Sequence, residues 1–184
     1  MSVMNQLEAW LAQERDVLAR MDAGVGPGVA RPDQVAGMTG LAMLQAILRG
    51  ELPYAPIART LDFNLLEVDE GRAMFQGTPG PAHLNPMGGI HGGWYATLLD
   101  SALGCAIHTM MPPGRGYTTA ELGLNLVRAI GSKAPRVRAE GKVIHCGRQL
   151  ATAEGRLYGP DGTLYAHATT TCLVFELPST KQTA

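Results

Sequence analysis

Residues 94–111 form the most apolar stretch of the chain, and they carry an aspartate, Asp100, near their centre. This stretch predicts one long buried helix, which ends where Pro112 and Pro113 cannot continue it. Burying an unpaired carboxylate costs several kcal/mol, so such a group is usually paired, protonated or used in chemistry. Asp100 is therefore the first candidate for a functional residue.

The residues that lead into this helix read Asn85-Pro-Met-Gly-Gly-Ile-His91-Gly92-Gly93. A pair of glycines at the start of a helix exposes unpaired backbone N–H groups at the positive end of the helix dipole. Such an end can bind a developing oxyanion. A helix with this start and an internal carboxylate suits the hydrolysis of an activated carbonyl.

Composition narrows the class of protein. The 184 residues suit one domain with a short appendage, and a net charge of -1 gives no basic field for nucleic acid or for an anionic membrane. The three cysteines have neither a paired nor a metal-binding spacing, so we expect buried thiols in a reducing cytosol: Cys105, Cys146 and Cys172.

The N-terminal sequence has no basic region followed by an apolar one, so we expect a cytoplasmic protein without a signal peptide. Residues 92–111 are the only candidate membrane span, but Asp100 and His108 interrupt them. We therefore expect no membrane partner.

The rest of the chain changes its periodicity near Pro56. Before it, residues 7–21 predict an amphipathic helix, a linker runs to about Gly37, and residues 40–49 predict a second helix. After it, Leu61, Phe63 and Leu65 alternate as a strand, and residues 72–78 return after a turn at 69–71. Further strands are expected at 117–127, 136–146, 149–158 and 164–177.

This order predicts an α+β domain in which an antiparallel sheet wraps around one long central helix, with an N-terminal helical extension. We divide the chain into the extension and linker at 1–55, the main domain at 56–178 and a tail at 179–184.

Two motifs resemble a known family. The spacing of Asn85, His91-Gly92-Gly93, Leu98 and Asp100, followed by the strand at 116–128, is similar to the PaaI-type branch of hotdog-fold acyl-CoA thioesterases. The resemblance covers roughly residues 57–176 and implies a hotdog fold, an acyl-CoA substrate and no cofactor.

The resemblance also implies roles for single residues. Asn85 would place the thioester or the water, the Gly92 N–H would polarise the carbonyl, and Asp100 would act as base or nucleophile. Thr119 would assist the water. We add His91 to the catalytic set, and Gly93, Trp94, Arg128 and Arg148 as substrate-binding candidates. Where relatives often have Arg-Pro, this chain has Arg128-Ala129, so the loop shape there is open.

The residues alone leave plainer alternatives. Asn85 could be a turn residue before Pro86, Thr119 an ordinary strand former, and His91 a hydrogen-bonded residue that holds the Gly92 loop, which is the role we favour for it. The arginines could lie on a solvated strand edge. Asp100 could bond only to neighbouring backbone.

Other classes of function stay open at this stage. A non-catalytic acyl-CoA-binding or regulatory module could use the same fold. A hotdog dehydratase or hydratase also uses an acid and a histidine, although His-Gly-Gly at a helix start suits the thioesterase better. The sequence has no G-x-S-x-G motif and no histidine pair at metal-ligand spacing, so we predict neither a serine hydrolase nor a metal site.

Helix geometry predicts an assembly. Gly92 and Asp100 are eight positions apart, which separates them by about 12 Å along a helix axis, so one carbonyl cannot contact both within a chain. Two helices paired antiparallel in a homodimer would bring each Gly92 near the other Asp100. We therefore expect a homodimer, with a dimer of dimers as the larger alternative.

Overall fold

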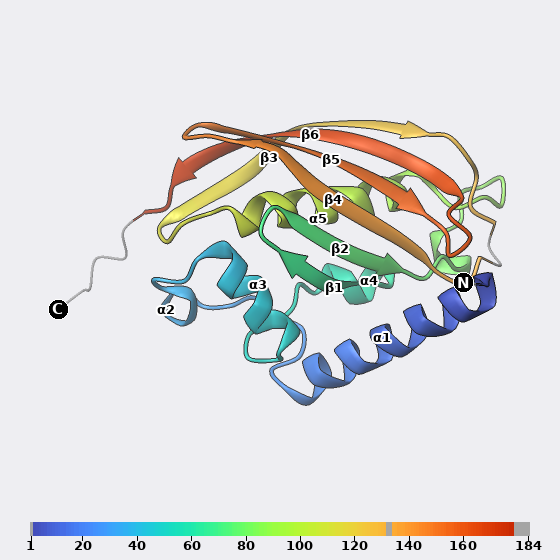
Figure 1. The fold of residues 1–184 in the computed structure, drawn as a ribbon, viewed down its shortest axis with the longest axis horizontal. Coiled ribbons are helices and arrows are strands. Elements are labelled where there is room, and N and C mark those ends of the chain that lie inside the picture. Colours follow the sequence, from blue (N-terminus) through green and yellow to red (C-terminus); the bar gives the residue numbers. More distant parts are fainter. Residues whose placement is uncertain (1, 132–133, 179–184) are drawn as a thin grey trace.

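The computed structural model describes residues 2–131 and 134–178 as one sheet, one central helix and a helical N-terminal extension (Figure 1). Six antiparallel strands pair in the order β1-β2-β4-β5-β6-β3 and curve around α5. The predicted α+β architecture is confirmed. The helices are α1 (Val3–Ala23), α2 (Pro32–Val35), α3 (Gly40–Leu48), α4 (Ile57–Leu61) and α5 (Gly92–Thr109), with a 3-10 turn η1 (Pro81–His83). The strands are β1 (Phe63–Asp69), β2 (Arg72–Gly77), β3 (Arg115–Leu126), β4 (Val137–Cys146), β5 (Leu150–Tyr158) and β6 (Leu164–Glu176).

Helix α5 supplies the centre of the core. Its sheet-facing side chains have no exposed surface at all: Leu98, Leu99, Ala102, Leu103, Ala106 and Ile107. The helix begins at Gly92, two residues before the apolar run, because the His91 side chain caps it. Among the described residues, no helix is long and apolar enough to cross a membrane.

Strand β4 lies close against the backbone of α5. A Cβ atom added at Gly141 would lie 2.4 Å from the Ala102 carbonyl oxygen, so only glycine permits this approach. The close contact lets the sheet wrap tightly over one side of the helix. The sheet does not cover the opposite side of α5.

Strand β3 forms an edge of the sheet and contains a β-bulge at Ala120, between Thr119 and Glu121. Before the bulge, Tyr117 and Thr119 face α5; after it, Leu122 and Leu124 pack against the core. The extra residue therefore changes which positions face inward. Simple alternation along β3 would have placed Thr119 and Leu122 on opposite faces.

One boundary of the predicted hairpin was wrong. Leu61 was expected in the first strand, but it is the last residue of α4, and β1 begins at Phe63. Asp62 adopts a left-handed conformation with φ of 51°, which ends the helical turn and starts the strand in one step. The predicted linker also contains the short helix α2 and a bridge between Pro27 and Tyr54.

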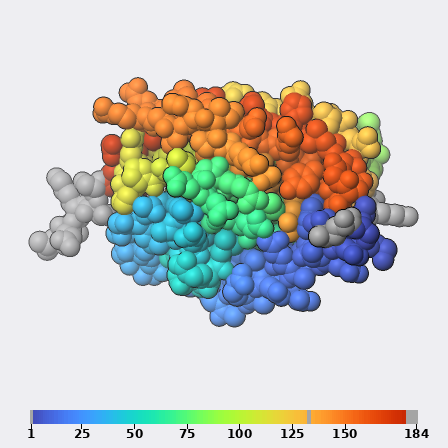
Figure 2. Space-filling view, in the orientation of Figure 1, coloured from blue at the N-terminus to red at the C-terminus, as the bar shows by residue number. Residues whose placement is uncertain are grey.

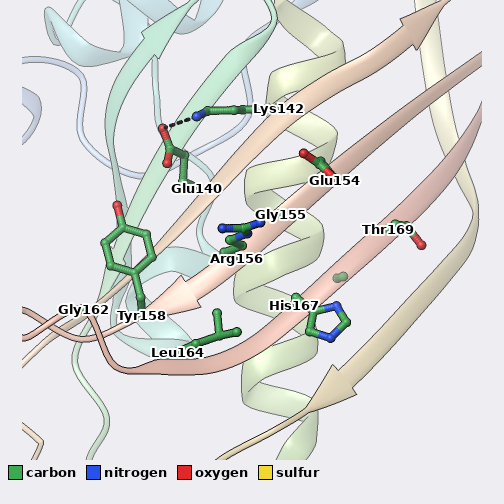
Figure 3. Close-up of a pocket in the computed structure, with 11 residues that line it drawn as sticks. Glu140, Lys142, Glu154, Gly155, Arg156, Tyr158, Gly162, Leu164, His167 and Thr169 are labelled. Carbon is green, nitrogen blue, oxygen red and sulfur yellow. Dashed lines mark ion pairs between the residues drawn. The ribbon is translucent and has the colours of Figure 1, made fainter.

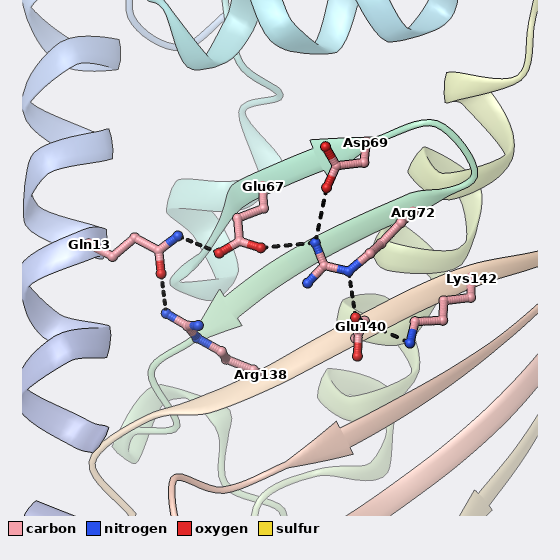
Figure 4. Close-up of polar contacts among 7 residues, drawn as sticks. All are labelled: Gln13, Glu67, Asp69, Arg72, Arg138, Glu140 and Lys142. Atoms are coloured by element: carbon pink, nitrogen blue, oxygen red, sulfur yellow. Dashed lines mark hydrogen bonds and ion pairs between the residues drawn. The ribbon is translucent and has the colours of Figure 1, made fainter. Parts of the chain in front are cut away.

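Helix α1 packs on the outer face of the sheet, opposite α5. The Trp10 ring lies against Tyr158, with ring centroids 5.9 Å apart, and the Arg138 guanidinium sits 4.4 Å over it. Gln13 donates to Glu67 at 2.6 Å and accepts from Arg138 at 2.7 Å (Figure 4). In Figure 2, the N-terminal segment, in blue, lies directly against the later strands, in orange.

The same network extends across the hairpin. Arg72 bonds Glu67 at 2.9 Å and Glu140 at 2.5 Å, and it approaches Asp69 at 3.4 Å (Figure 4). Burial of Glu67 works to raise its pKa, but hydrogen bonds from Gln13 and Arg72 outweigh it and hold the pKa below its usual value. Glu67 is thus an ionised anchor between α1 and the sheet.

The packing of α1 on the sheet predicts that side-chain truncation lowers the free energy of unfolding more at Trp10 than at Leu11. We expect Trp10→Ala to lower the free energy of unfolding by about 3 kcal/mol, because the buried ring loses its contacts with Arg138 and Tyr158. Leu11→Ala, at a neighbouring position that is 37% exposed, should cost at most about 0.5 kcal/mol. Urea denaturation of both variants measures the difference, and equal losses would contradict the docking.

Candidate active site

Asp100 lies midway along α5, on the side of the helix that the sheet leaves partly open. Its Oδ1 accepts a hydrogen bond of 3.1 Å from the Thr119 hydroxyl on β3. The structure therefore brings these two predicted residues together. A carboxylate next to a hydroxyl can bind and deprotonate a water molecule placed between them and a substrate.

The bulge at Ala120 is what permits this pairing. It lets Thr119 face Asp100 while Leu122 and Leu124 still fill the core, so one strand serves both needs. No pattern in the sequence marks the bulge. Pairing of Thr119 with Asp100 could be suggested from the family motif, whereas its geometric cause required the structure.

A cavity of about 300 Å³ opens beside Asp100. From α5 and β3 it is lined by Asp100, Ser101, Gly104, Cys105, Tyr117 and Thr119. Gly104 makes room for Tyr117, since an added Cβ would lie 2.8 Å from the phenol oxygen. The remaining wall is mainly apolar and comes from the N-terminal extension, α4 and the β1–β2 hairpin.

The thiol and phenol groups that line the cavity are protonated near neutral pH. Burial, and then the nearby Asp100 carboxylate, raises the pKa of the Cys105 thiol to about 12. Burial also raises the pKa of Tyr117 well above its usual value, with smaller contributions from its two cysteine neighbours and Asp100. Both side chains are therefore neutral near pH 7, and Asp100 is the one carboxylic acid among the residues that line the cavity.

The start of α5 presents a free backbone donor. The Gly93 N–H is already bound to Nδ1 of His91 at 2.9 Å, and the Trp94 N–H bonds the His91 carbonyl at 2.9 Å. Within residues 2–131 and 134–178, no acceptor bonds the Gly92 N–H. The His91 side chain thus caps α5 and holds the loop at Gly92 by a hydrogen bond, as favoured for it above.

Asn85 forms its hydrogen bonds within the loop before α5. Its Oδ1 accepts from Met87 N at 2.9 Å and from Gly89 N at 3.1 Å, while its backbone N–H bonds the Gly89 carbonyl at 2.8 Å. These bonds match the turn role that is common for asparagine. Asn85 shapes the approach to Gly92 in this structure, and it does not contact Asp100 or Thr119.

The predicted substrate-binding residues fall into separate places. The Trp94 ring is buried: it stacks on His83 at 5.3 Å and donates to the Leu61 carbonyl at 2.8 Å. A shallow hollow is lined by Trp94, His91 and Gly93, away from Asp100. Trp94, predicted as a substrate-binding residue, therefore does not line the cavity beside Asp100.

Arg128 and Arg148 are exposed and lie near opposite ends of α5. Arg128 follows β3, whose Leu126 side chain reaches the Gly92 end, and Arg148 lines a hollow with Met110 and Pro112 at the other end. One chain therefore does not bring the two arginines to one ligand. It also leaves Gly92 and Asp100 about 12 Å apart along α5.

A hollow larger than the cavity beside Asp100 lies elsewhere. It measures about 820 Å³ and sits on the outer face of β4, β5 and β6, where charged groups of both signs mix with Tyr158, Leu164 and His167 (Figure 3). The sheet separates it from Asp100, and none of the predicted site residues lines it. In the described part of the chain, no group of three or more His, Cys, Asp or Glu side chains is placed to hold a metal ion.

Comparisons with known proteins agree with the fold and the motif. The Thioesterase superfamily profile matches residues 87–166. A putative thioesterase from Ralstonia eutropha, described as phenylacetic acid degradation-related, is 30% identical over 70% of this chain and 97% of its own, with a TM-score of 0.64. The phenylacetic acid degradation protein PaaI from Thermus thermophilus is 28% identical over 64% of this chain and 97% of its own, with a TM-score of 0.59.

A thioesterase family protein from Silicibacter pomeroyi is also similar, with 26% identity, 66% and 90% coverage, and a TM-score of 0.60. A search of curated proteins gave no match. The fold, the motif around Gly92 and Asp100, and these relatives place the chain in the PaaI-type hotdog thioesterases. It is a thioester hydrolase.

Two substitutions can distinguish a capping role of His91 from a role as acid or base. His91→Asn keeps a side-chain acceptor for the Gly93 N–H, whereas His91→Ala removes it. We expect His91→Ala to cost about 1 kcal/mol of stability and to lower turnover, and His91→Asn to retain most of both. Steady-state thioester hydrolysis and thermal unfolding provide the measurements. An equal loss of turnover in both variants would show that His91 acts as an acid or base instead.

Proposed function

We propose that this protein hydrolyses the thioester of a small aryl- or medium-chain acyl-CoA to the free acid and CoA. The observation that carries the proposal is the Asp100–Thr119 pair at the edge of a largely apolar cavity. In the proposed site, the Gly92 N–H of one subunit binds the carbonyl oxygen, and Asp100 of the partner subunit supplies the base or nucleophile.

The reaction follows from these groups. With Asp100 as base, it takes a proton from water, and the water oxygen forms a bond to the thioester carbon. Negative charge then moves to the carbonyl oxygen, where the Gly92 N–H and the positive end of α5 stabilise it. The carbon–sulfur bond breaks, and the CoA thiolate receives the proton held by Asp100. With Asp100 as nucleophile, its carboxylate oxygen bonds to the thioester carbon and the carbon–sulfur bond breaks, which releases the CoA thiolate and leaves a mixed anhydride. Water then cleaves the anhydride to the free acid and the Asp100 carboxyl group, whose proton passes to the thiolate.

Two surfaces support a homodimer. Strand β3 is an edge strand, and residues 118–121 at its middle are exposed, so its unpaired backbone can pair with another chain. Beside it, the first half of α5 presents a partly exposed stripe that recurs at helical spacing: Gly93, Thr97, Asp100 and Ser101. An antiparallel pair formed through this side would place each Gly92 toward the partner's Asp100.

The same arrangement supports a place for coenzyme A. In an antiparallel pair, Arg128 of one subunit lies at the end of α5 where Arg148 of the partner subunit also lies. Guanidinium groups bind phosphates through paired hydrogen bonds. We therefore assign these two exposed residues to the CoA phosphates, next to the Gly92 donor. A larger dimer of dimers is compatible with this unit and contributes nothing to the proposed chemistry.

The first test is chemical. Asp100→Asn keeps the side-chain shape but cannot accept the proton, so we expect kcat for octanoyl-CoA or phenylacetyl-CoA to fall roughly a hundredfold or more. Asp62→Asn makes the same chemical change at an exposed position where asparagine tolerates the left-handed backbone, and it should leave kcat unchanged. Near-normal turnover in Asp100→Asn would make Asp100 structural and remove the centre of the mechanism.

The second test asks whether two chains share a site. Gly92→Pro removes the donor while suiting the first position of a helix, and the extended conformation of His91 suits a following proline. Gly92→Ala is its control because it keeps the N–H, and its Cβ also meets Leu126, 3.1 Å away. We expect Gly92→Pro to lower kcat by about a hundredfold and Gly92→Ala to have a small effect.

Refolding equal amounts of inactive Gly92→Pro and Asp100→Asn chains should then restore activity. Mixed dimers would hold one doubly defective and one intact site, which gives about a quarter of the wild-type activity with random pairing. Subunit exchange can be verified with differently tagged chains. Verified mixed dimers without recovered activity would show that each site belongs to one chain.

A further inference from the structure

The N-terminal extension forms part of the cavity beside Asp100. Its contribution consists of Met21 from α1, Leu44 and Ile47 from α3, and Tyr54 and Ala55 from the segment before α4. We propose that residues 1–55 build the acyl-binding end of the active site and set the length of the acyl group. This inference rests on the proposed function, because it assigns the occupant of the same site.

The wall exists because the sheet does not close. Strands β1 and β3 are the two edges of the sheet, and the side of α5 that carries Asp100 lies between them. Helix α3 packs against both β1 and α5 and so covers part of this gap. Its first residue explains the fit: a Cβ at Gly40 would collide with the His108 carbonyl oxygen, and the Gly40 N–H bonds the Met111 carbonyl at 2.9 Å.

The cavity combines a polar pair with a mainly apolar wall. Asp100 on α5 and Thr119 on β3 are hydrogen-bonded together and both line it. The lining from α3 and the start of β1 is aliphatic or aromatic, with Leu44, Ile47 and Phe63. A thioester has the same division, since its reacting carbonyl is polar and its acyl group is apolar. In the proposed complex, the thioester carbonyl therefore lies at Asp100 and the acyl group packs against the apolar wall.

The part of the wall that contains Tyr54 is held in place by polar contacts outside the cavity. The Tyr54 hydroxyl donates to Asp22 at 2.7 Å and accepts from Arg59 at 2.7 Å, and Arg59 also bonds Asp22 at 2.7 Å. These contacts join α1, the segment before α4, and α4. Tyr54 therefore presents a fixed ring to the cavity, which suits selection by size.

The volume indicates the class of acyl group. At about 30 Å³ for each group of water or methylene size, a cavity of about 300 Å³ takes roughly ten non-hydrogen atoms. Hexanoyl, octanoyl and phenylacetyl groups fit within this limit. An acetyl group would leave most of the cavity unfilled, and a palmitoyl group would exceed it.

The share of this chain that its relatives do not match is similar in size to the extension. The Ralstonia and Thermus proteins match over 97% of their own length but over only 70% and 64% of this chain. About a third of this chain thus has no counterpart in either, a share comparable to that of residues 1–55. An acyl-length limit set by the extension is therefore expected to differ from theirs.

Two cavity-lining positions allow a test without emptying the core, because the side chains of Ala55, in the extension, and Ile57, the first residue of α4, are exposed. Ala55→Trp should shorten the cavity, and Ile57→Ala should lengthen it. Because each buried methylene contributes about fourfold, we expect Ala55→Trp to lower the ratio of kcat/KM for octanoyl-CoA to that for butanoyl-CoA at least tenfold. Ile57→Ala should raise the ratio for decanoyl-CoA over octanoyl-CoA by about fourfold or more.

Val29→Trp is the matched control. Val29 belongs to the same extension, is 84% exposed and does not line the cavity, so the added indole should leave the acyl-length profile unchanged. Thermal unfolding of all three variants establishes that each is folded. Ile57→Ala reports on the cavity, whereas Ala55→Trp reports on the extension itself. If Ala55→Trp leaves the profile the same as Val29→Trp does, the extension does not set acyl length and the proposal is overturned.

Binding separates this inference from the hydrolase mechanism. In full-length Asp100→Asn protein, calorimetry with butanoyl-, octanoyl- and palmitoyl-CoA should show tightest binding for octanoyl-CoA, and Ala55→Trp should abolish that preference. Length-dependent binding without wild-type hydrolysis would retain the acyl cavity and reject the proposed reaction. Wild-type hydrolysis with no effect of Ala55→Trp on turnover or binding would retain the reaction and reject the cavity assignment.

Discussion

Burial of one side of α5 against a curved sheet is the contact on which the rest of the structure depends. Leu98, Leu99 and Leu103 have no exposed surface, and Gly141 lets β4 approach the helix backbone directly. A helix has a full circumference to cover, however, and a six-stranded sheet with free edges covers only part of it. The side that the sheet does not cover carries Asp100, so the proposed reacting group lies where the helix is incompletely packed.

The N-terminal extension packs against the sheet and α5 at two places. Helix α3 closes part of the gap between β1 and α5, whereas α1 lies on the outer face of the sheet and fixes the extension there. Gln13, Glu67 and Arg138 connect these layers with hydrogen bonds in which every partner is charged or strongly polar. Such bonds are directional, so they hold α1 at one position on the sheet more specifically than apolar contact alone.

Much of this architecture could be predicted from the sequence because it depends on local periodicity. The apolar run at 94–111 has the length of a helix, and the alternating segments around it have the length of strands. The helical turn at Leu61 and the bulge at Ala120 could not be predicted, because each depends on a backbone change of one residue that serves tertiary packing. The family motif pointed to Asp100 and Thr119 as a pair of interest, but only the bulge explains how Thr119 reaches the carboxylate.

The cavity was beyond prediction for a related reason. Met21, Leu44 and Tyr54 read locally as ordinary core positions, and nothing in their spacing relates them to Asp100. Their meeting depends on how α3 packs across the open side of the sheet, which is a long-range contact. A carboxylate at the edge of a largely apolar cavity then acquires a function that neither part has alone, because the apolar part can hold an acyl group and the carboxylate can act on its carbonyl. Packing that covers a helix incompletely thus leaves both the reacting group and the space for its substrate in one place.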